Sequence, residues 1–239
     1  MASEPLPPLP TGPVTSISDA IARMQEIEAA LPPADGLACF NRMYRIVTET
    51  VKAQVAQGFF HDPAFMEHLD IVFANLYLGA VDGFCSEPST ACRAWNALFS
   101  RRSDTSVLPM QFALAGMNAH INRDLAVAVV SACRDLGTSP ESGSHEADFD
   151  KVNRLLGALD AQIRQSFESG LILELDQRAA AGLENLAGNF GIDAARETAW
   201  INAQALWHLR DISFIYKQYL DGMDRTAAFT GRALMIPLV

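Results

Sequence analysis

Two residues in the middle of the chain, His120 and Asp124, have the types and the spacing that acid/base chemistry requires. They lie four positions apart in an otherwise apolar stretch, so a helix would place both side chains on one face. A carboxylate beside an imidazole orients the ring and raises its basicity, which suits a general base near neutral pH. We therefore predict that His120 is an acid/base group oriented by Asp124. The alternative is a purely structural pair, because buried ionisable groups need partners.

Further polar residues, near this pair and on two other expected helices, are candidates for contacts with a substrate. Arg123 is suited to an anionic group of a substrate or to an ion pair with Asp124. Gln204 and His208 lie one turn apart on the last long helix, beside Trp200, and mix aromatic and polar character as a pocket wall does. Each candidate also has a structural interpretation, as a core side chain or as a polar link between helices. The predicted substrate-binding residues are Asn75, Asn118, Arg123, Trp200, Gln204 and His208.

The spacing of the His, Cys, Asp and Glu residues gives little support to a metal centre or an organic cofactor. Metal sites in helical bundles typically use Glu-x-x-His motifs on facing helices, and the sequence has none. A Walker loop, a dinucleotide-binding fingerprint and a Gly-x-Ser-x-Gly motif are also missing. We therefore predict no metal and no organic cofactor. A metal-dependent hydrolase or oxygenase that uses His120, Asp124 and His208 remains the alternative.

Composition and charge limit the class of protein and its partners. The 239 residues are 49% hydrophobic and lack a Gly/Ser/Pro-rich linker, which favours one domain with a sizeable core. The formal net charge of −10 argues against a nucleic-acid partner, because phosphate binding needs a basic surface. The cysteines show no disulfide or metal-finger pattern, which favours the cytoplasm. Without a leader sequence or an apolar run of about 20 residues, we expect no membrane span.

The elements that must position these residues are predicted to be helices throughout. Residues 1–15 contain five of the twelve prolines and are expected to be extended. Ser16 and Asp62 are suited to cap helices, and Pro63 follows the second cap. The prediction is an all-α, single-domain bundle of roughly seven to nine helices over residues 16–239, behind the proline-rich lead. Expected helices span residues 16–31, 37–57, 63–84, 90–100, 109–136, 148–170, 171–186 and 193–220. A tail over 221–239 follows, and its apolar end, residues 233–239, is expected to pack across the bundle.

Local features near the helix ends complete this prediction. Asp148 and Asp193 precede apolar periodic segments and are expected to be N-caps. His61 lies beside a cap, and His145 lies in a segment rich in Ser, Gly and Pro. Both histidines are expected at the surface.

Three strings resemble the signature of an uncharacterised helical protein family that is common in actinobacteria. They are residues 73–77 (Phe-Ala-Asn-Leu-Tyr), 118–125 (Asn-Ala-His-Ile-Asn-Arg-Asp-Leu) and 148–153 (Asp-Phe-Asp-Lys-Val-Asn). The resemblance spans roughly residues 35–215 and leaves the proline-rich start outside. It implies one helical domain and carries no reaction over to this chain.

The function expected from these residues is acid/base chemistry on a small, largely apolar molecule, without an organic cofactor. An isomerisation or cyclisation in specialised metabolism fits this description, with Asn118, Arg123 and His208 as donors that polarise the substrate. The expected pocket is lined by the third, fifth and last long helices, and the rings of His120 and His208 are expected to face it. The alternative from a different class is a non-catalytic protein that binds a hydrophobic ligand.

Overall fold

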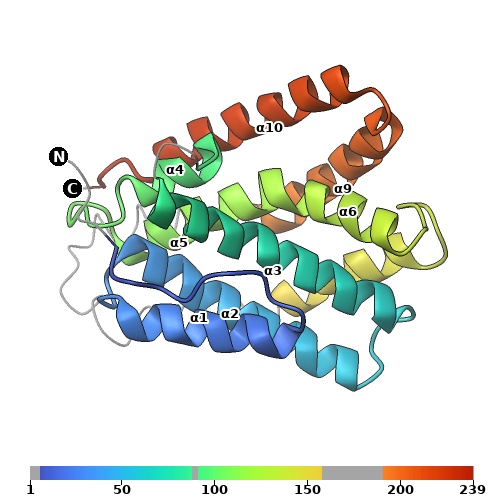
Figure 1. Ribbon diagram of the computed structural model, residues 1–239, viewed down its shortest axis with the longest axis horizontal. Helices are drawn as coiled ribbons and strands as arrows, with labels where there is room; N and C mark the ends of the chain where they lie inside the picture. The colour runs from blue at the N-terminus through green and yellow to red at the C-terminus, as the bar shows by residue number, and fades with distance from the viewer. Residues whose placement is uncertain (1–5, 88–90, 158–190, 239) are drawn as a thin grey trace.

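The computed structural model describes residues 6–87, 91–157 and 191–238, and within these ranges the chain is helical and contains no strand (Figure 1). The predicted all-α bundle is confirmed. The helix expected over 171–186 lies outside the described residues. Residues 145–157 are helical. The other elements are α1 (Ile17–Ala30), α2 (Gly36–Ala56), α3 (Pro63–Ser86), α4 (Arg93–Phe99), α5 (Pro109–Ala119), the π-helix η2 (His120–Leu125), α6 (Ala126–Asp135), α9 (Ile192–Leu209) and α10 (Ser213–Leu234).

The segments α5, η2 and α6 follow one another without a break and form one long rod through the bundle (Figure 1). Helix α2 packs against α5 and α1, and α3 packs against α6. Helix α10 packs against α4 and α5, and α9 packs against η2 and α6. Two hydrophobic clusters fill the interior, and Val47, Phe73 and Met117 contact both. The π-helix itself contacts α3, α9 and α10, so its side chains are held from several directions.

Two helices begin where polar caps predict. The hydroxyl of Ser16 accepts a hydrogen bond from the amide of Asp19 at 3.0 Å, at the start of α1. The carboxylate of Asp62 accepts one from the amide of Phe65 at 3.0 Å, and Pro63 is the first residue of α3. Both predicted starts are confirmed, because a side-chain acceptor satisfies an amide that the first helical turn leaves unpaired.

The described part of the proline-rich lead, residues 6–15, is non-helical and lies alongside α1 and α3 (Figure 1). The amide of Val14 donates to Asn75 Oδ1 at 2.8 Å, and Asn75 Nδ2 donates to the carbonyl of Val14 at 2.9 Å. Arg23 donates to the carbonyl of Gly12 and pairs with Asp82. Both polar atoms of Asn75 therefore hold the lead in place. This contact is a structural role for Asn75, beside the predicted role in substrate binding.

The C-terminal part of the chain differs from the prediction. In place of one helix over 193–220 and a tail, α9 ends at Leu209 and a separate helix, α10, continues far past residue 220. Residues 221–234, the first part of the expected tail, are the second half of α10. Of the apolar end, Leu234 and Met235 are buried in the core, as expected, and the side chain of Gln111 donates to the carbonyl of Leu234 at 2.8 Å. Met223 and Ala227 are buried there, and α10 packs against α4 and α5. This packing stabilises the second half of α10, because tertiary contacts supply most of the stability of a helix in a protein.

Two residues predicted as helix N-caps, Asp193 and Asp148, are not at the N-cap position of their helices. Gly191, and not Asp193, is the N-cap of α9. The helix over 145–157 begins before Asp148, so the prediction of an N-cap at Asp148 is wrong. Its buried carboxylate accepts hydrogen bonds from the amides of His61 at 2.9 Å and Asp62 at 2.6 Å. Asp148 thus fixes the segment that leads into α3.

The two histidines expected at the surface differ from each other. His61 is exposed, as predicted. His145 is buried, and the prediction of its exposure is wrong. Its ring stacks on Phe65 with centroids 3.7 Å apart, and its Nδ1 lies 3.0 Å from the carbonyl oxygen of Ser139. The contact with Phe65 is long-range, and the contact with Ser139 depends on the turn between the two residues. The Ser, Gly and Pro content of the segment therefore does not indicate that His145 is buried.

Helix α3 is the one described helix whose length and composition would also suit a membrane span. The core helix of a soluble protein can have the same length and composition, so these two properties do not by themselves indicate a membrane span. One face of α3, which includes Phe65, Leu69 and Tyr77, is buried in the bundle.

Candidate functional site

The predicted acid/base pair lies in the π-helix η2, which interrupts the long helix expected over 109–136. His120 is its first residue, and Asp124 lies near its end. A π-helical turn widens the helix by one residue, and such turns occur frequently at functional sites. The pair still meets, with His120 Nδ1 3.2 Å from Asp124 Oδ2. The sequence does not indicate the π-helix, because its apolar periodicity is continuous with that of α5 and α6.

The carboxylate of Asp124 is fully buried and accepts three side-chain hydrogen bonds. Its Oδ2 accepts one from His120 and one from the indole Nε1 of Trp95, at 2.7 Å. Its Oδ1 accepts one from the guanidinium of Arg123. Asp124 thus orients the imidazole of His120, as predicted, and also joins η2 to α4. Arg123 forms the ion pair that was one of its two predicted roles.

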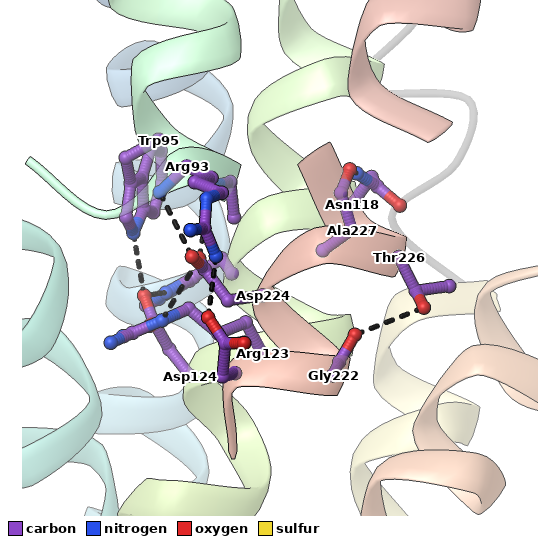
Figure 2. A network of polar contacts seen from close by, with 12 residues as sticks. Arg93, Trp95, Asn118, Arg123, Asp124, Gly222, Asp224, Thr226 and Ala227 are labelled. Atoms are coloured by element: carbon purple, nitrogen blue, oxygen red, sulfur yellow. Dashed lines mark hydrogen bonds and ion pairs between the residues drawn. The ribbon is translucent and has the colours of Figure 1, made fainter. Parts of the chain in front are cut away.

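A second carboxylate, Asp224 on α10, extends this network (Figure 2). Its Oδ1 lies 3.5 Å from Nε of Arg123. Its two oxygens accept hydrogen bonds from the amides of Arg93 and Ala94 at 3.0 Å, at the start of α4. A carboxylate at that position satisfies unpaired amides and complements the helix dipole. Arg123 is therefore shared by two carboxylates and is held away from the role of a free anion-binding group.

The charge states of the pair follow from their surroundings. Burial alone would raise the pKa of Asp124, but the hydrogen bond from His120 and the charge of Arg123 bring it below its ordinary value. Burial lowers the pKa of His120, and the contact with Asp124 only partly opposes this. His120 is therefore a neutral imidazole at pH 7. Because ionised Asp124 is purely an acceptor, Nδ1 of His120 carries the ring proton and Nε2 is left with a free lone pair.

Aromatic side chains surround the ring of His120. Phe73 stacks on it with centroids 3.5 Å apart, and Tyr44 meets it edge-on at 4.5 Å. Phe40 and Trp95 follow, each with its centroid at 5.8 Å. Within the described part of the chain, Nε2 of His120 is buried and has no hydrogen-bond partner. A neutral imidazole with one nitrogen held by a carboxylate and the other bare is the arrangement of a general base.

Two further buried groups that lack partners lie on the helices beside this ring, and the sequence analysis missed both. They are the hydroxyl of Tyr44 on α2 and Oδ2 of Asp70 on α3, neither of which has a described hydrogen-bond partner. Burial raises the pKa of Asp70 to about 7. Burial also raises the pKa of Tyr44 well above its ordinary value, and the nearby charge of Asp70 raises it further. Asp70 lies one turn before Phe73 on the buried face of α3. A carboxylate on an apolar face was the signal that could have identified it.

The predicted residues of the last long helix do not join this site. Trp200 is buried against Phe149, with ring centroids 4.7 Å apart, and Gln204 is half-buried. His208 is exposed in the last turn of α9, so the expectation that it faces a cavity shared with His120 is wrong. The metal-binding alternative of His120, Asp124 and His208 is therefore not assembled. Nor does any group of three or more His, Cys, Asp or Glu residues suited to a metal ion occur within the described residues.

A cleft of about 640 Å³ lies where α9 and α10 meet the segment before and within η2. Asn118 and Asn122 line it from that segment, and Asn202 lines it from α9. No residue of α3 is among those that line it, so this cleft is distinct from the pocket expected between the third, fifth and last long helices. Asn118 is buried, and its Nδ2 donates to the carbonyl of Ala227 at 2.7 Å. The motif around His120 thus contributes to two places, the aromatic interior and this cleft.

Comparison with known proteins gives a family but no activity. Residues 17–237 match a protein family described as a family of unknown function (DUF5995), and the chain belongs to this family. No curated protein and no solved structure matches the chain. The match starts at the first residue of α1 and leaves out the proline-rich lead. The expectation of an uncharacterised family is thus confirmed.

Proposed function

We propose that this member of the family is a small-molecule enzyme that transfers protons on a largely apolar substrate, in an isomerisation or a cyclisation. The observation that carries the proposal is the state of His120. It is neutral and buried, its Nδ1 is held by Asp124, and its Nε2 has no partner among the described residues. A buried nitrogen without a partner calls for an explanation, and a role in catalysis is one of the few available.

In this proposal Nε2 of His120 takes a proton from an acidic C–H group of the substrate. Asp124 keeps the ring in the tautomer that leaves Nε2 bare and stabilises the imidazolium that forms. Asp70 has a pKa of about 7 and is therefore protonated in part at neutral pH. In that form it donates a proton or a hydrogen bond to an oxygen of the substrate. Arg123 stays in the ion-pair network and acts by holding Asp124 in its charged form.

The aromatic surroundings favour a substrate without charge. Phe40, Tyr44, Phe73 and Trp95 offer apolar ring faces and edges around His120, and none of them compensates a net charge on a substrate. Phe73 is half-buried and stacks directly on His120, so its ring separates the imidazole from the outside. We propose that rotation of Phe73 admits the substrate.

A test that needs no knowledge of the natural substrate is exchange of C–H hydrogen with D₂O. The purified protein is incubated with a panel of cyclic ketones and β,γ-enones, and deuterium incorporation is followed by NMR. We expect exchange above the buffer rate, and His120→Gln should lower it by about 10²–10⁴-fold in a folded protein. Asp70→Asn should also lower it. The matched control, His208→Gln, changes an exposed histidine and should leave it unaltered.

Two results would overturn this proposal. The first is exchange that His120→Gln leaves at the wild-type rate, which would remove His120 from the chemistry. The second is no exchange with any member of the panel while the same ketones bind saturably, which would favour the non-catalytic hydrophobic-ligand-binding protein.

A further inference from the structure

The cleft between α9, α10 and the Asn118–Asn122 segment is chemically unlike the surroundings of His120. None of its lining side chains, all within the described residues, carries a charge, and most carry an amide or a hydroxyl group. Its volume of about 640 Å³ falls in the range of about 300–1,000 Å³ that is usual for small-molecule sites. Amide and hydroxyl groups reach the cleft from Asn118, Asn122, Asn202, Gln218, Tyr219 and Thr230.

Hydrogen bonds within the walls fix which atoms of two amides face a ligand. The hydroxyl of Tyr219 donates to Oδ1 of Asn202 at 2.7 Å, which leaves the Nδ2 donors of Asn202 free of a described partner. Nδ2 of Asn122 donates to Oδ1 of Asn118 at 3.0 Å, which leaves Oδ1 of Asn122 as an acceptor. The cleft therefore offers a donor from Asn202 on α9 and an acceptor from Asn122 on η2.

Gly222 keeps the α10 wall open. It is exposed and lines the cleft, and a Cβ built on it would meet no atom within 4 Å. Figure 2 shows that α10 carries Asp224 toward the Arg123 network while Thr226 lies on its other side. A side chain at position 222 would therefore occupy open space and leave the packing of α10 against α4 and α5 unchanged.

From this chemistry we propose that the cleft binds a neutral, polyhydroxylated molecule of the size of a mono- or disaccharide. A charged ligand would lose hydration without finding a counter-charge. An apolar ligand would leave the amides of Asn122 and Asn202 unpaired, which costs binding free energy. A hydroxyl group both donates and accepts, so several of them on one ring match a cleft with both kinds of group. The inference is independent of the proposed acid/base chemistry.

The experiment is isothermal titration of the whole protein with glucose, galactose, maltose and trehalose. We expect saturable binding of at least one of these sugars, with a Kd of about 1 mM or tighter. Gly222→Leu should weaken it by at least about tenfold by filling the cleft, and Asn202→Leu should do so by removing the donor. The control is Gly79→Leu, because Gly79 is also an exposed helical glycine with open space at its Cβ, on α3 and away from the cleft. It should bind the same sugar with unchanged affinity.

Circular dichroism checks that each variant is folded. If Gly222→Leu does not fold, Asn202→Leu still tests the proposal. Glucose 6-phosphate serves as a charged probe and should bind at least about tenfold more weakly than glucose. The proposal is overturned if none of the four sugars binds saturably. It is also overturned if the folded variants of the cleft bind as the wild type does, or if the phosphate ester binds more tightly than the sugar.

Discussion

Asp124 connects the parts of the molecule at the scale of single residues. It accepts hydrogen bonds from His120, Trp95 and Arg123 and is fully buried, so its replacement leaves the Arg123 charge without its nearest partner. The dyad of His120 and Asp124 could be predicted from spacing alone. The contributions of Trp95 and Asp224 could not, because they come from helices that are far away in the sequence.

Removal of the charge of Asp124 should strongly destabilise the fold. We expect Asp124→Asn to lower the free energy of unfolding by about 3–5 kcal/mol, because a neutral amide replaces a buried carboxylate that accepts three hydrogen bonds and is the nearer of the two partners of Arg123. Asp135→Asn is the control: Asp135 pairs with His68 at an exposed site and should contribute less than about 1 kcal/mol. Urea unfolding followed by circular dichroism measures both. Equal losses in the two variants would show that the network does not hold the helices together.

Asp70 should make stability depend on pH in a direction opposite to that of most carboxylates. Its pKa is raised to about 7 in the folded protein, against about 3.9 for an exposed Asp. Between these pH values the folded state holds a proton that the unfolded chain has released. The contribution of Asp70 to the free energy of unfolding is therefore fully present below about pH 4 and is lost as the pH rises toward 7.

Asn cannot ionise, so Asp70→Asn should remove this loss. Relative to the wild type, the variant should gain stability between pH 5 and pH 8, by at most about 3 kcal/mol. Urea unfolding at the two pH values measures the gain. A stability difference that is the same at both would contradict the buried, unpaired carboxyl. Retention of a group that costs stability at neutral pH is typical of functional sites.

At the scale of elements, the closest approach in the rod is at Gly116 of α5. A Cβ at this position would collide with the ring of Phe40 on α2, and that ring also meets the edge of His120. We expect Gly116→Ala to destabilise the protein by about 1–3 kcal/mol. Gly79→Ala, on an open helix surface, should be neutral or stabilising by up to about 1 kcal/mol. Thermal unfolding compares them, and a Gly116→Ala variant as stable as Gly79→Ala would contradict the tight contact of α2 with α5.

The same scale shows which elements a sequence can predict. The starts of α1 and α3 depend on Ser16 and Asp62, whose capping contacts are only three residues away, and both were predicted. The second half of α10 and the π-helix depend on packing against distant helices, and both were missed. Asn75 is one of the residues for which the sequence left a structural role open. Its partner is the backbone of Val14, which no local pattern indicates.

At the scale of the whole molecule, the rod of α5, η2 and α6 separates two different chemistries. On one side, His120 lies among aromatic rings with Tyr44 and Asp70 on the neighbouring helices. On the other, Asn118 and Asn122 line the uncharged cleft. The all-α class and the motif could be predicted because they are local properties. The separation of these two environments could not, because it depends on which faces of η2 the helices α3, α9 and α10 cover.

The measurement that tests the central claim most directly is ¹⁵N NMR of the histidine side chains. The claim is that His120 is a neutral imidazole, protonated at Nδ1 and bare at Nε2. At pH 6.5, the ordinary pKa of histidine, we expect His120 to remain neutral in this tautomer. The signals that disappear in His120→Gln are assigned to His120. Protonation of Nε2, either in the other tautomer or in an imidazolium at pH 6.5, would contradict the account and leave the dyad as a structural ion pair.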